Sequence, residues 1–409
     1  MGDVSTKPAP RYSLNLDLPG TERWNDIAAD YKDEAYRITD YLKSQLPAWA
    51  YPTIIQLAAD IEPYFKDYGD EMIGLATALD LDLGEIVATN LVYELERIGV
   101  NCSNWNNTGP TLDDDAIPFG LSCADARRDY EAKRAAQLLT GPEGLCTSIV
   151  TQNDNNAVLH GRNLDWNIPE ELKGFVIDVD VYQGGELLYV GTTAVGFVGF
   201  LNGMRMQGEK WTVSQDARHH GGRIPLNLVE ALAAHALTPE QAIRYTLENT
   251  EVQGFDGALS SLSNVQIVTD VYYIMAGEKT NQDAAVITRD RNEPRDVWRL
   301  GTPADTPPNH GQQTRGSRQA KSDTNSSTNW WMVETNYDHW NSVPAADDRR
   351  DPANEMMLAI GSADQTNHDS LFSVLSTYPV FNAHTTFTTM MDPAAGTYNS
   401  TVWYGNFVA

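Results

Sequence analysis

The sequence lacks long hydrophobic runs: no stretch of about 18 apolar residues, the length that spans a bilayer, occurs in its 409 residues. The first residues, MGDVSTKPAPRYSLNLDL, also lack the apolar core of a secretory signal. We therefore expect no membrane-spanning segment, and the N-terminus taken alone favours an intracellular protein.

Basic residues are scarce as well. Lysine and arginine number 29 against 56 aspartates and glutamates, which gives a formal net charge of −27. A field of this sign repels nucleic acid and anionic membrane surfaces, so we expect no nucleic-acid partner. The charge would shrink in an acidic compartment as carboxylates take up protons, although solubility in salt explains the same balance.

Cysteine and histidine are few, with 3 and 8 residues, and no HExxH, CxxC or GxGxxG spacing occurs. A zinc site and a dinucleotide-binding turn are therefore not indicated. Cys102 and Cys123 flank one polar segment while Cys146 stands apart, a pattern that fits a disulfide plus a working thiol and equally fits three reduced thiols. Asn-X-Ser/Thr sequons, which favour secretion, begin at Asn101, Asn106, Asn325 and Asn399.

What the chain does have is a change of hydrophobic period at Cys146. Apolar residues recur at spacings of three and four over residues 20–98, which predicts helices after a short strand-like run at 12–18. Residues 100 to about 122 are polar and turn-rich, helix resumes over 124–139, and we interpret the segment near 100–140 as a surface insertion. The predicted division is a helical N-terminal region, 1–145, followed by a second region, 146–409.

Beyond Cys146 the period is two. Hairpins are predicted around NDNN at 153–156 and around Gly-Gly at 184–185. Residues 301–329 are poor in apolar side chains and are predicted to form a mobile loop. The remaining predicted elements are helices at 224–237, 239–250 and 370–377, strands at 270–277, 284–290, 296–300 and 330–337, and a final hairpin over 384–406. Strands and helices without regular alternation favour an α+β layered sandwich over a doubly wound sheet.

The lone Cys146 is a candidate nucleophile. A thiol attacks only as thiolate, so it needs a base or a positive charge nearby, and no histidine stands in an obvious partnership with it. If the bond before Cys146 were cleaved, the new α-amino group could serve as that base. The alternative is a small buried apolar side chain, with Arg162 and Asp165 as an unrelated surface pair.

Several motifs carry a family resemblance. In chain order, CTSIV, HGRNLDW, VGTTAVGFVGF, TVSQDAR, DVYYIMAG, VITRDR, VETNYDHW and DDRR resemble the family of lysosomal N-acylethanolamine-hydrolysing acid amidase and acid ceramidase. The match runs from about residue 12 to the C-terminus, except for the insertions near 100–140 and 301–329. VETNYDHW and GRNLD are closer to the acid amidase.

The resemblance implies an N-terminal nucleophile cysteine hydrolase with an αββα sandwich, made as a proenzyme that cuts itself. Cys146 would be both cleavage residue and nucleophile, and Leu145 would end the α chain, leaving 146–409 as the β chain. The two chains would stay associated. The family uses no cofactor and no metal.

Four further residues carry over from the family motifs. Arg162 and Asp165 would hold the cysteine and its freed amine, the first by favouring thiolate and the second by accepting hydrogen bonds from the ammonium. Asn336 would donate its side-chain amide to the oxyanion, and Arg349 would complete the polar network.

One position departs from the family pattern. Where the family has a glutamate, the most direct alignment places Ala217, which can neither accept a hydrogen bond nor balance an arginine. Asp216 is adjacent, but neighbouring residues of a strand face opposite ways, so we leave Asp216 out of the predicted site.

We expect hydrolysis of fatty acid amides, N-acylethanolamines rather than ceramide. An acid ceramidase or another N-acyl amide hydrolase of the same fold is one alternative. A lipid-binding pseudoenzyme or uncut proenzyme, suggested by Ala217, is another. The helices at 50–98 are candidates for contact with a lipid surface, although a stripe of leucine and isoleucine is usually core. The resemblance implies a lysosomal or secreted protein.

Overall fold

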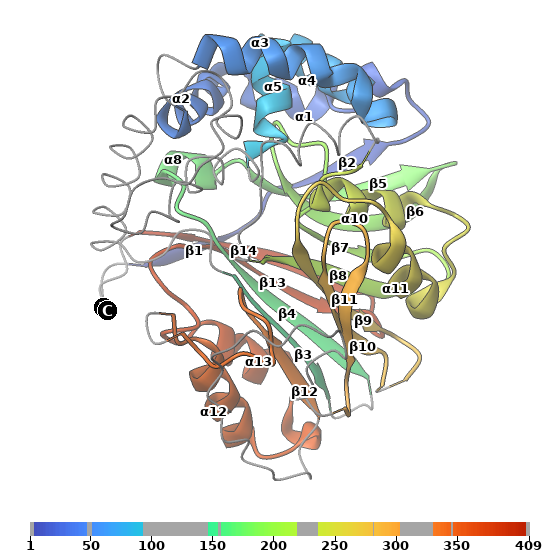
Figure 1. Ribbon diagram of the computed structural model, residues 1–409, viewed down its shortest axis with the longest axis vertical. Coiled ribbons are helices and arrows are strands. Elements are labelled where there is room, and N and C mark those ends of the chain that lie inside the picture. The colour runs from blue at the N-terminus through green and yellow to red at the C-terminus, as the bar shows by residue number, and fades with distance from the viewer. Residues whose placement is uncertain are drawn as a thin grey trace, which may run out of the picture.

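The computed structural model describes residues 4–46, 51–92, 146–153, 157–218, 236–280, 282–302, 330–344 and 347–405, with the side chains of residues 66 and 67 left aside. In this part of the chain two β-sheets stack face to face, and helices cover the outer face of each (Figure 1). This is an α+β fold with the layer order helix, sheet, sheet, helix, so the predicted αββα sandwich is confirmed.

The larger sheet has eight strands. In spatial order they are β11 (Pro294–Arg299), β10 (Ala284–Arg289), β9 (Val271–Gly277), β8 (Trp211–Ala217), β7 (Asn202–Arg205), β6 (Glu186–Ala194), β5 (Val176–Gln183) and β2 (Arg11–Asn15). Neighbours are antiparallel except β2, which runs parallel to β5. The predicted β5–β6 hairpin is confirmed, and its turn residues Gly184 and Gly185 have φ of 60° and 79°, where glycine carries no steric cost.

The smaller sheet has six antiparallel strands and carries the cysteine. In spatial order they are β1 (Ser5–Pro8), β14 (Thr397–Tyr404), β13 (Thr385–Asp392), β4 (Val158–Asp165), β3 (Cys146–Gln152) and β12 (Trp331–Glu334). Cys146 is the first residue of β3 and pairs with Leu164 on β4, which confirms the predicted hairpin. The N-terminal strands β1 and β2 form an edge of each sheet, one on either side of Pro10.

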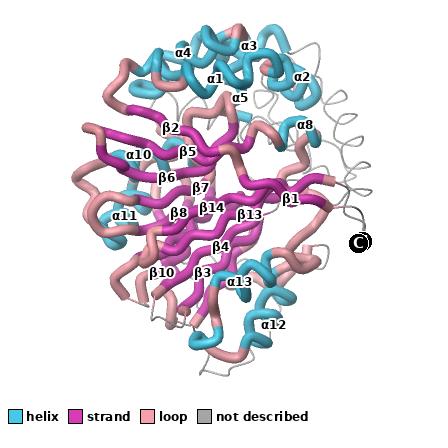
Figure 2. The backbone as a smooth tube through the Cα atoms, turned by 180° about the vertical axis from the view of Figure 1, so that it is seen from behind, coloured by secondary structure: helices cyan, strands magenta, loops and turns pink. Residues whose placement is uncertain are grey.

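Two helices cover each sheet. Helices α10 (Pro239–Glu248) and α11 (Gly254–Asn264) pack on the eight-stranded sheet, and α12 (Arg350–Ile360) and α13 (His368–Leu375) pack on the six-stranded sheet (Figure 2). A capping box of Thr238 and Gln241 opens α10, with Pro239 in its first turn as the sequence predicts. The predicted helix at 224–237 falls outside the described residues except for its last two.

The N-terminal region is helical, as predicted, over its described residues. Its elements are η1 (Gly20–Glu22), α1 (Asn25–Tyr31), η2 (Lys32–Glu34), α2 (Tyr36–Gln45), α3 (Tyr51–Ile61), η3 (Glu62–Tyr68), α4 (Gly69–Leu79) and α5 (Leu83–Thr89). These helices lie against one end of the sandwich and share a single hydrophobic core with α10, α11 and the outer face of the eight-stranded sheet (Figure 1). The short helices α8 (Glu170–Lys173) and η7 (Ala363–Gln365) complete the described elements.

The layer between the sheets is polar at its centre. Apolar clusters fill its two sides, one around Val150 and Ile274 and one around Val190 and Met391. Between them lie buried serines, threonines, a histidine, an asparagine and an arginine that bond to one another across the sheets. Buried polar groups are stable only when they form hydrogen bonds, so the hydrogen bonds in this layer fix the orientation of its side chains.

Three predicted features lie outside the described residues. They are the whole insertion at 100–140 with Cys102 and Cys123, the loop at 301–329 except its first two residues, and Leu145. No helix among the described residues is long and apolar enough to cross a membrane.

Candidate active site

Cys146 lies at the start of β3, and its side chain is only 4% exposed. Its backbone N–H donates to Asn336 Oδ1 at 2.7 Å. Its side chain packs in a small apolar cluster with Leu164, Val176 and Leu201. The thiol is therefore held at the boundary between this apolar cluster and the polar layer between the sheets.

Arg162 reaches the thiol from the neighbouring strand β4. Its Nη2 lies 3.6 Å from Cys146 Sγ and donates to the Gln215 carbonyl at 2.6 Å, while Nη1 donates to Asn202 Oδ1 at 3.1 Å. The guanidinium is completely buried, and Nε has no partner among the described residues. Arg162 thus stands beside the cysteine, as the sequence predicts.

Asp165 ends β4, on the same hairpin. Its carboxylate accepts hydrogen bonds from Thr385 Oγ1 and Asn382 Nδ2, both at 2.7 Å, and lies 3.5 Å from Arg349 Nη1. Burial raises the pKa of Asp165, although Arg349 and the two hydrogen bonds act in the opposite direction.

Asn336 and Arg349 contact the backbone of Cys146. Asn336 follows β12, and Arg349 directly precedes α12. Arg349 donates from Nη1 to the Cys146 carbonyl and from Nη2 to Asn336 Oδ1, the latter at 2.8 Å, and its Nε bonds Asp347. Side chains from β3, β4, the β12 end and the α12 start therefore converge on one residue.

Asn336 has an acceptor role in addition to the predicted donor role. Its oxygen faces Cys146 and accepts from the cysteine N–H and from Arg349, while Nδ2 donates to the Ala217 carbonyl at 2.7 Å. The family motifs predict only the donor role, toward the substrate oxyanion. An amide has both a donor end and an acceptor end, and here the acceptor end holds the backbone of the nucleophile.

Asp216 is the site residue that the sequence analysis left out. Its carboxylate is completely buried, accepts from Ser148 Oγ at 2.9 Å and lies 3.7 Å from Arg162 Nη2. Gln215, one residue earlier, turns to the opposite face of β8 and bonds Glu240 on α10. Alternation along β8 was correct, but it is Asp216 rather than position 217 that faces the other sheet.

The thiol is held in its neutral form by this environment. Burial raises the pKa of Cys146 to about 11, with Asp216 and Asp165 acting in the same direction and Arg162 against them. Burial raises the pKa of Asp216 to about 7, opposed chiefly by Arg162. A thiol of this kind needs a base within reach before it can act as a nucleophile.

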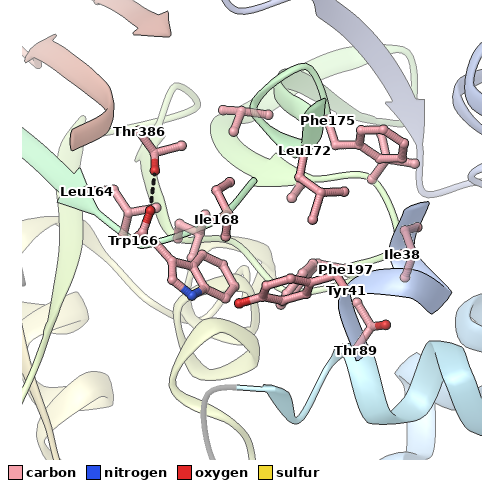
Figure 3. A pocket seen from close by; sticks show the side chains of 14 residues that line it. Ile38, Tyr41, Thr89, Leu164, Trp166, Ile168, Leu172, Phe175, Phe197 and Thr386 are labelled. Atoms are coloured by element: carbon pink, nitrogen blue, oxygen red, sulfur yellow. Dashed lines mark hydrogen bonds between the residues drawn. The ribbon is translucent and has the colours of Figure 1, made fainter. Parts of the chain in front are cut away.

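An apolar pocket opens beside the cysteine. It has about 500 Å³ of empty volume, which includes space open to solvent. The rings of Trp166, Phe197 and Tyr41 lie close together in it, with Leu164 at the end toward Cys146 (Figure 3). Helices α2 and α5 supply part of its wall, so both regions of the chain build it. Among the described residues no group of three or more His, Cys, Asp or Glu side chains is placed to hold a metal ion.

Comparison with known proteins decides the family. N-acylethanolamine-hydrolyzing acid amidase of Rattus norvegicus is 30% identical over 388 residues, which cover 94% of this chain and 86% of the relative. The chain belongs to the N-acylethanolamine-hydrolysing acid amidase and acid ceramidase family. Acid ceramidase of Mus musculus is 28% identical, over 98% of this chain and 87% of the relative.

Two further similarities are narrower. A family model described as the beta subunit of N-acylethanolamine-hydrolyzing acid amidase matches residues 7–65, in the N-terminal helical region. A solved structure described as the Caenorhabditis elegans N-acylethanolamine-hydrolyzing acid amidase ortholog is 32% identical, with a TM-score of 0.48, and covers 61% of this chain and 93% of its own. As a member of this family the chain is an amide hydrolase.

Proposed function

We propose that this hydrolase is a cysteine amidase that cleaves fatty acid amides through a thioester on Cys146. The observation that carries the proposal is the convergence on one buried residue: the thiol lies 3.6 Å from Arg162, and the backbone nitrogen donates to Asn336 at 2.7 Å. A buried cysteine that serves only for packing has no need of a cation beside its sulfur.

The base in this proposal is the α-amino group of Cys146, freed by self-cleavage between Leu145 and Cys146. Because burial raises the pKa of the thiol to about 11, the thiol does not ionise unaided at neutral or acidic pH. A backbone amide nitrogen cannot accept a proton, whereas an α-amine with a reference pKa of about 8 can. Asn336 Oδ1 already accepts from this nitrogen and would orient the amine.

The reaction would proceed in two stages. The amine takes the thiol proton, the thiolate attacks the amide carbon, and the resulting oxyanion is stabilised by an N–H of Asn336 Nδ2 that is not engaged by Ala217. The ammonium returns the proton to the departing amine, which leaves an acyl thioester. Water, deprotonated by the same amine, then attacks the thioester. The ammonium returns the proton to the sulfur, which regenerates the Cys146 thiol, and the fatty acid is released.

The pocket lined by Trp166 and Phe197 supports a fatty acyl group as the bound portion. Its lining is apolar, and Leu164 connects it to Cys146 across the β3–β4 pair. An acyl chain buried there would place its carbonyl carbon near the sulfur. Burial of each methylene contributes roughly 0.8 kcal/mol, so chain length should govern affinity.

Contact with a lipid surface is supported by exposed apolar side chains on the N-terminal region. Tyr36, Leu57, Tyr64 and Ile73 are 56%, 38%, 45% and 36% exposed. Sedimentation with phosphatidylcholine vesicles should deplete the protein from solution, and a Leu57→Ser, Tyr64→Ser variant should remain in the supernatant. Equal sedimentation of both proteins would remove this part of the proposal.

Substrate choice is tested by measuring kcat/KM for N-palmitoylethanolamine and for ceramide side by side at about pH 4.5, below the pKa of about 7 to which burial raises Asp216. We expect preference for N-palmitoylethanolamine, as in the relatives with that name. Preference for ceramide would instead assign the protein to the ceramidase branch. Activity in acid would also agree with a lysosomal or secreted location.

Ala217 motivates the alternative of a pseudoenzyme or an uncut proenzyme. A second buried carboxylate, Asp216, lies 3.7 Å from Arg162 and supplies an acid at the site that Ala217 cannot. Cys146→Ala should abolish both cleavage and turnover, while Ala217→Glu should not be needed for either. A wild-type chain that stays intact in acid and releases no amine would establish the pseudoenzyme.

A further inference from the structure

Arg162 shares one nitrogen between two acidic groups. Its Nη2 lies 3.6 Å from Cys146 Sγ and 3.7 Å from Asp216 Oδ1. The other contacts of the guanidinium are neutral: the Gln215 carbonyl and the Asn202 amide oxygen. A completely buried cation is costly without a counter-charge, so thiolate and carboxylate compete for the same positive charge.

We propose that Asp216 is a positioning residue that sets the reactivity of Cys146 through Arg162. Ionised, its carboxylate neutralises the guanidinium and disfavours a second negative charge on the sulfur. When the carboxyl group of Asp216 is protonated, the charge of the guanidinium stabilises the thiolate alone. The inference rests on the proposed role of Cys146 as nucleophile, and it assigns to Asp216 a function that the reaction steps themselves do not require.

A directed chain of hydrogen bonds ends on Asp216. Ser148 has one hydroxyl hydrogen and gives it to Asp216, so Ser214, 3.0 Å away, must donate to Ser148. His160 Nε2 lies 3.0 Å from Ser214 Oγ and extends the chain. Burial lowers the pKa of His160 to about 3, so the histidine is neutral and adds no competing charge. Ser148 thus fixes Oδ1 of Asp216, the oxygen that lies 3.7 Å from Arg162 Nη2.

Several other titratable groups surround Asp216. They are Cys146 from β3, His160, Arg162 and Asp165 from β4, Tyr272 from β9, Glu334 from β12 and Arg349 before α12. Burial raises the pKa of Glu334 well above its ordinary value, which favours its neutral form. Among these groups the cation within 4 Å of Asp216 is Arg162, at 3.7 Å, which makes the pair the dominant coupling.

The sign of the pH dependence follows from this pairing. Burial raises the pKa of Asp216 to about 7, so below that pH the carboxyl is protonated and the wild-type site resembles one with asparagine at 216. Above that pH the carboxyl is ionised, and its negative charge raises the pKa of the Cys146 thiol. An asparagine variant should therefore differ from wild type only on the alkaline side.

The test is the rate at which Cys146 reacts with methyl methanethiolsulfonate, followed by mass spectrometry of the peptide that contains it. For Asp216→Asn we expect a rate about tenfold above wild type near pH 9, equal to about one unit of thiol pKa, and a ratio near one at about pH 5. A merely structural role would change the rate equally at both pH values.

Two further variants serve as controls for the effect of Asp216→Asn. Asp178→Asn removes a different buried carboxylate between the same sheets, bonded to Thr192 and Ser400, and should leave the ratio near one at both pH values. Ser148→Ala keeps the charge but removes the donor to Asp216, so it should shift the ratio in the same direction by less. If Asp216→Asn does not fold, the Ser148→Ala ratio decides alone.

Equal rates for wild type and variant near pH 9, including no reaction in either, would overturn the proposal, and so would a slower variant. The labelling rate needs no substrate. A variant that labels faster in a protein without amidase activity would retain this inference and refute the proposed function. Amidase activity with unchanged labelling would do the reverse.

Discussion

Arg162 and Arg244 are both completely buried, but their partners differ. Arg244 on α10 grips both oxygens of Glu71 on α4, at 2.6 and 2.7 Å, and bonds Glu248 at 2.7 Å. Arg162 has no carboxylate within hydrogen-bonding distance among the described residues, and its nearest acidic neighbours are a thiol and Asp216. Arg244, whose charge is compensated by carboxylates, links the N-terminal helices to the sandwich. The charge of Arg162 is compensated less, and in the proposed mechanism it stabilises the thiolate of Cys146.

The acidic partners differ in the same way. Burial acts to raise the pKa of Glu71, but its ion pair and hydrogen bonds with Arg244 hold the pKa below the ordinary value, so Glu71 is charged over the working range. Burial raises the pKa of Asp216 to about 7, because Arg162 at 3.7 Å compensates less. The pKa of the buried carboxyl group is therefore lowered in the Arg244–Glu71 pair and raised in the Arg162–Asp216 pair.

The largest effect should come from breaking the satisfied pair. Arg244→Met leaves the Glu71 carboxylate buried with only Arg23 and Trp24 as partners, and we expect a loss of about 3–5 kcal/mol in the free energy of unfolding, measured by urea denaturation. Adding Glu71→Leu should recover part of the loss. Turnover per folded molecule should be unchanged, and an unaltered denaturation midpoint would contradict the assigned role of this pair.

Removing the underpaired cation should affect chemistry instead. Arg162→Met keeps an unbranched apolar stem and removes the charge beside the sulfur, so kcat/KM for a fatty acid amide should fall by at least about 100-fold, or about 2.7 kcal/mol. Thermal unfolding and kcat/KM measured on the same sample separate the two arginines. A loss of less than tenfold in a folded variant would show that the thiolate does not depend on this cation.

Stability should decrease as pH rises from about 4 to 7. The folded-state pKa values of Asp216, about 7, and Asp178, about 6, are above the ordinary 3.8, so the folded protein binds protons that the unfolded chain releases. Each group contributes a slope of about 1.4 kcal/mol per pH unit between its two pKa values. Asp178→Asn should flatten the curve between about pH 4 and 6. A melting temperature that rises with pH there would contradict the sign.

The smallest effect is expected at an exposed arginine. Arg11 bonds Asp180 at 2.7 Å, but its side chain is 42% exposed and screened by water. Asp180→Asn should change the free energy of unfolding by less than about 1 kcal/mol and leave kcat/KM unchanged. A cost comparable to that of Arg244→Met would show that burial does not govern the value of these pairs.

The sequence predicts the layered fold because period-two runs and hairpin turns are local signals. The β3–β4 and β5–β6 hairpins follow from NDNN and Gly-Gly flanked by such runs. The placement of β1 and β2 at edges of different sheets does not follow, because it depends on contacts with β14 and β5, far along the chain. Strand β7, only four residues long, has no such pattern to reveal it.

Cys146 and Arg162 could be proposed from their spacing and the family motifs, but Asp216 could not. Every residue of β8 is buried, so the alternation of the polar Thr212, Ser214 and Asp216 with mostly apolar neighbours does not show which face of the strand meets the other sheet. Alternation then shows that Asp216 and Ala217 point apart without showing which one faces the cysteine. Only the stacking of β8 on β3, with Ser148 opposite Asp216, decides this.

The central claim is that Cys146 becomes an N-terminal nucleophile that carries the acyl group. Intact-mass spectrometry tests this most directly, on protein incubated at about pH 4.5 and then quenched during turnover of N-palmitoylethanolamine. We predict two fragments that separate between Leu145 and Cys146, with a palmitoyl group on the fragment that starts with the cysteine. A single chain of unchanged mass, or a palmitoyl group on any other residue, would contradict the claim.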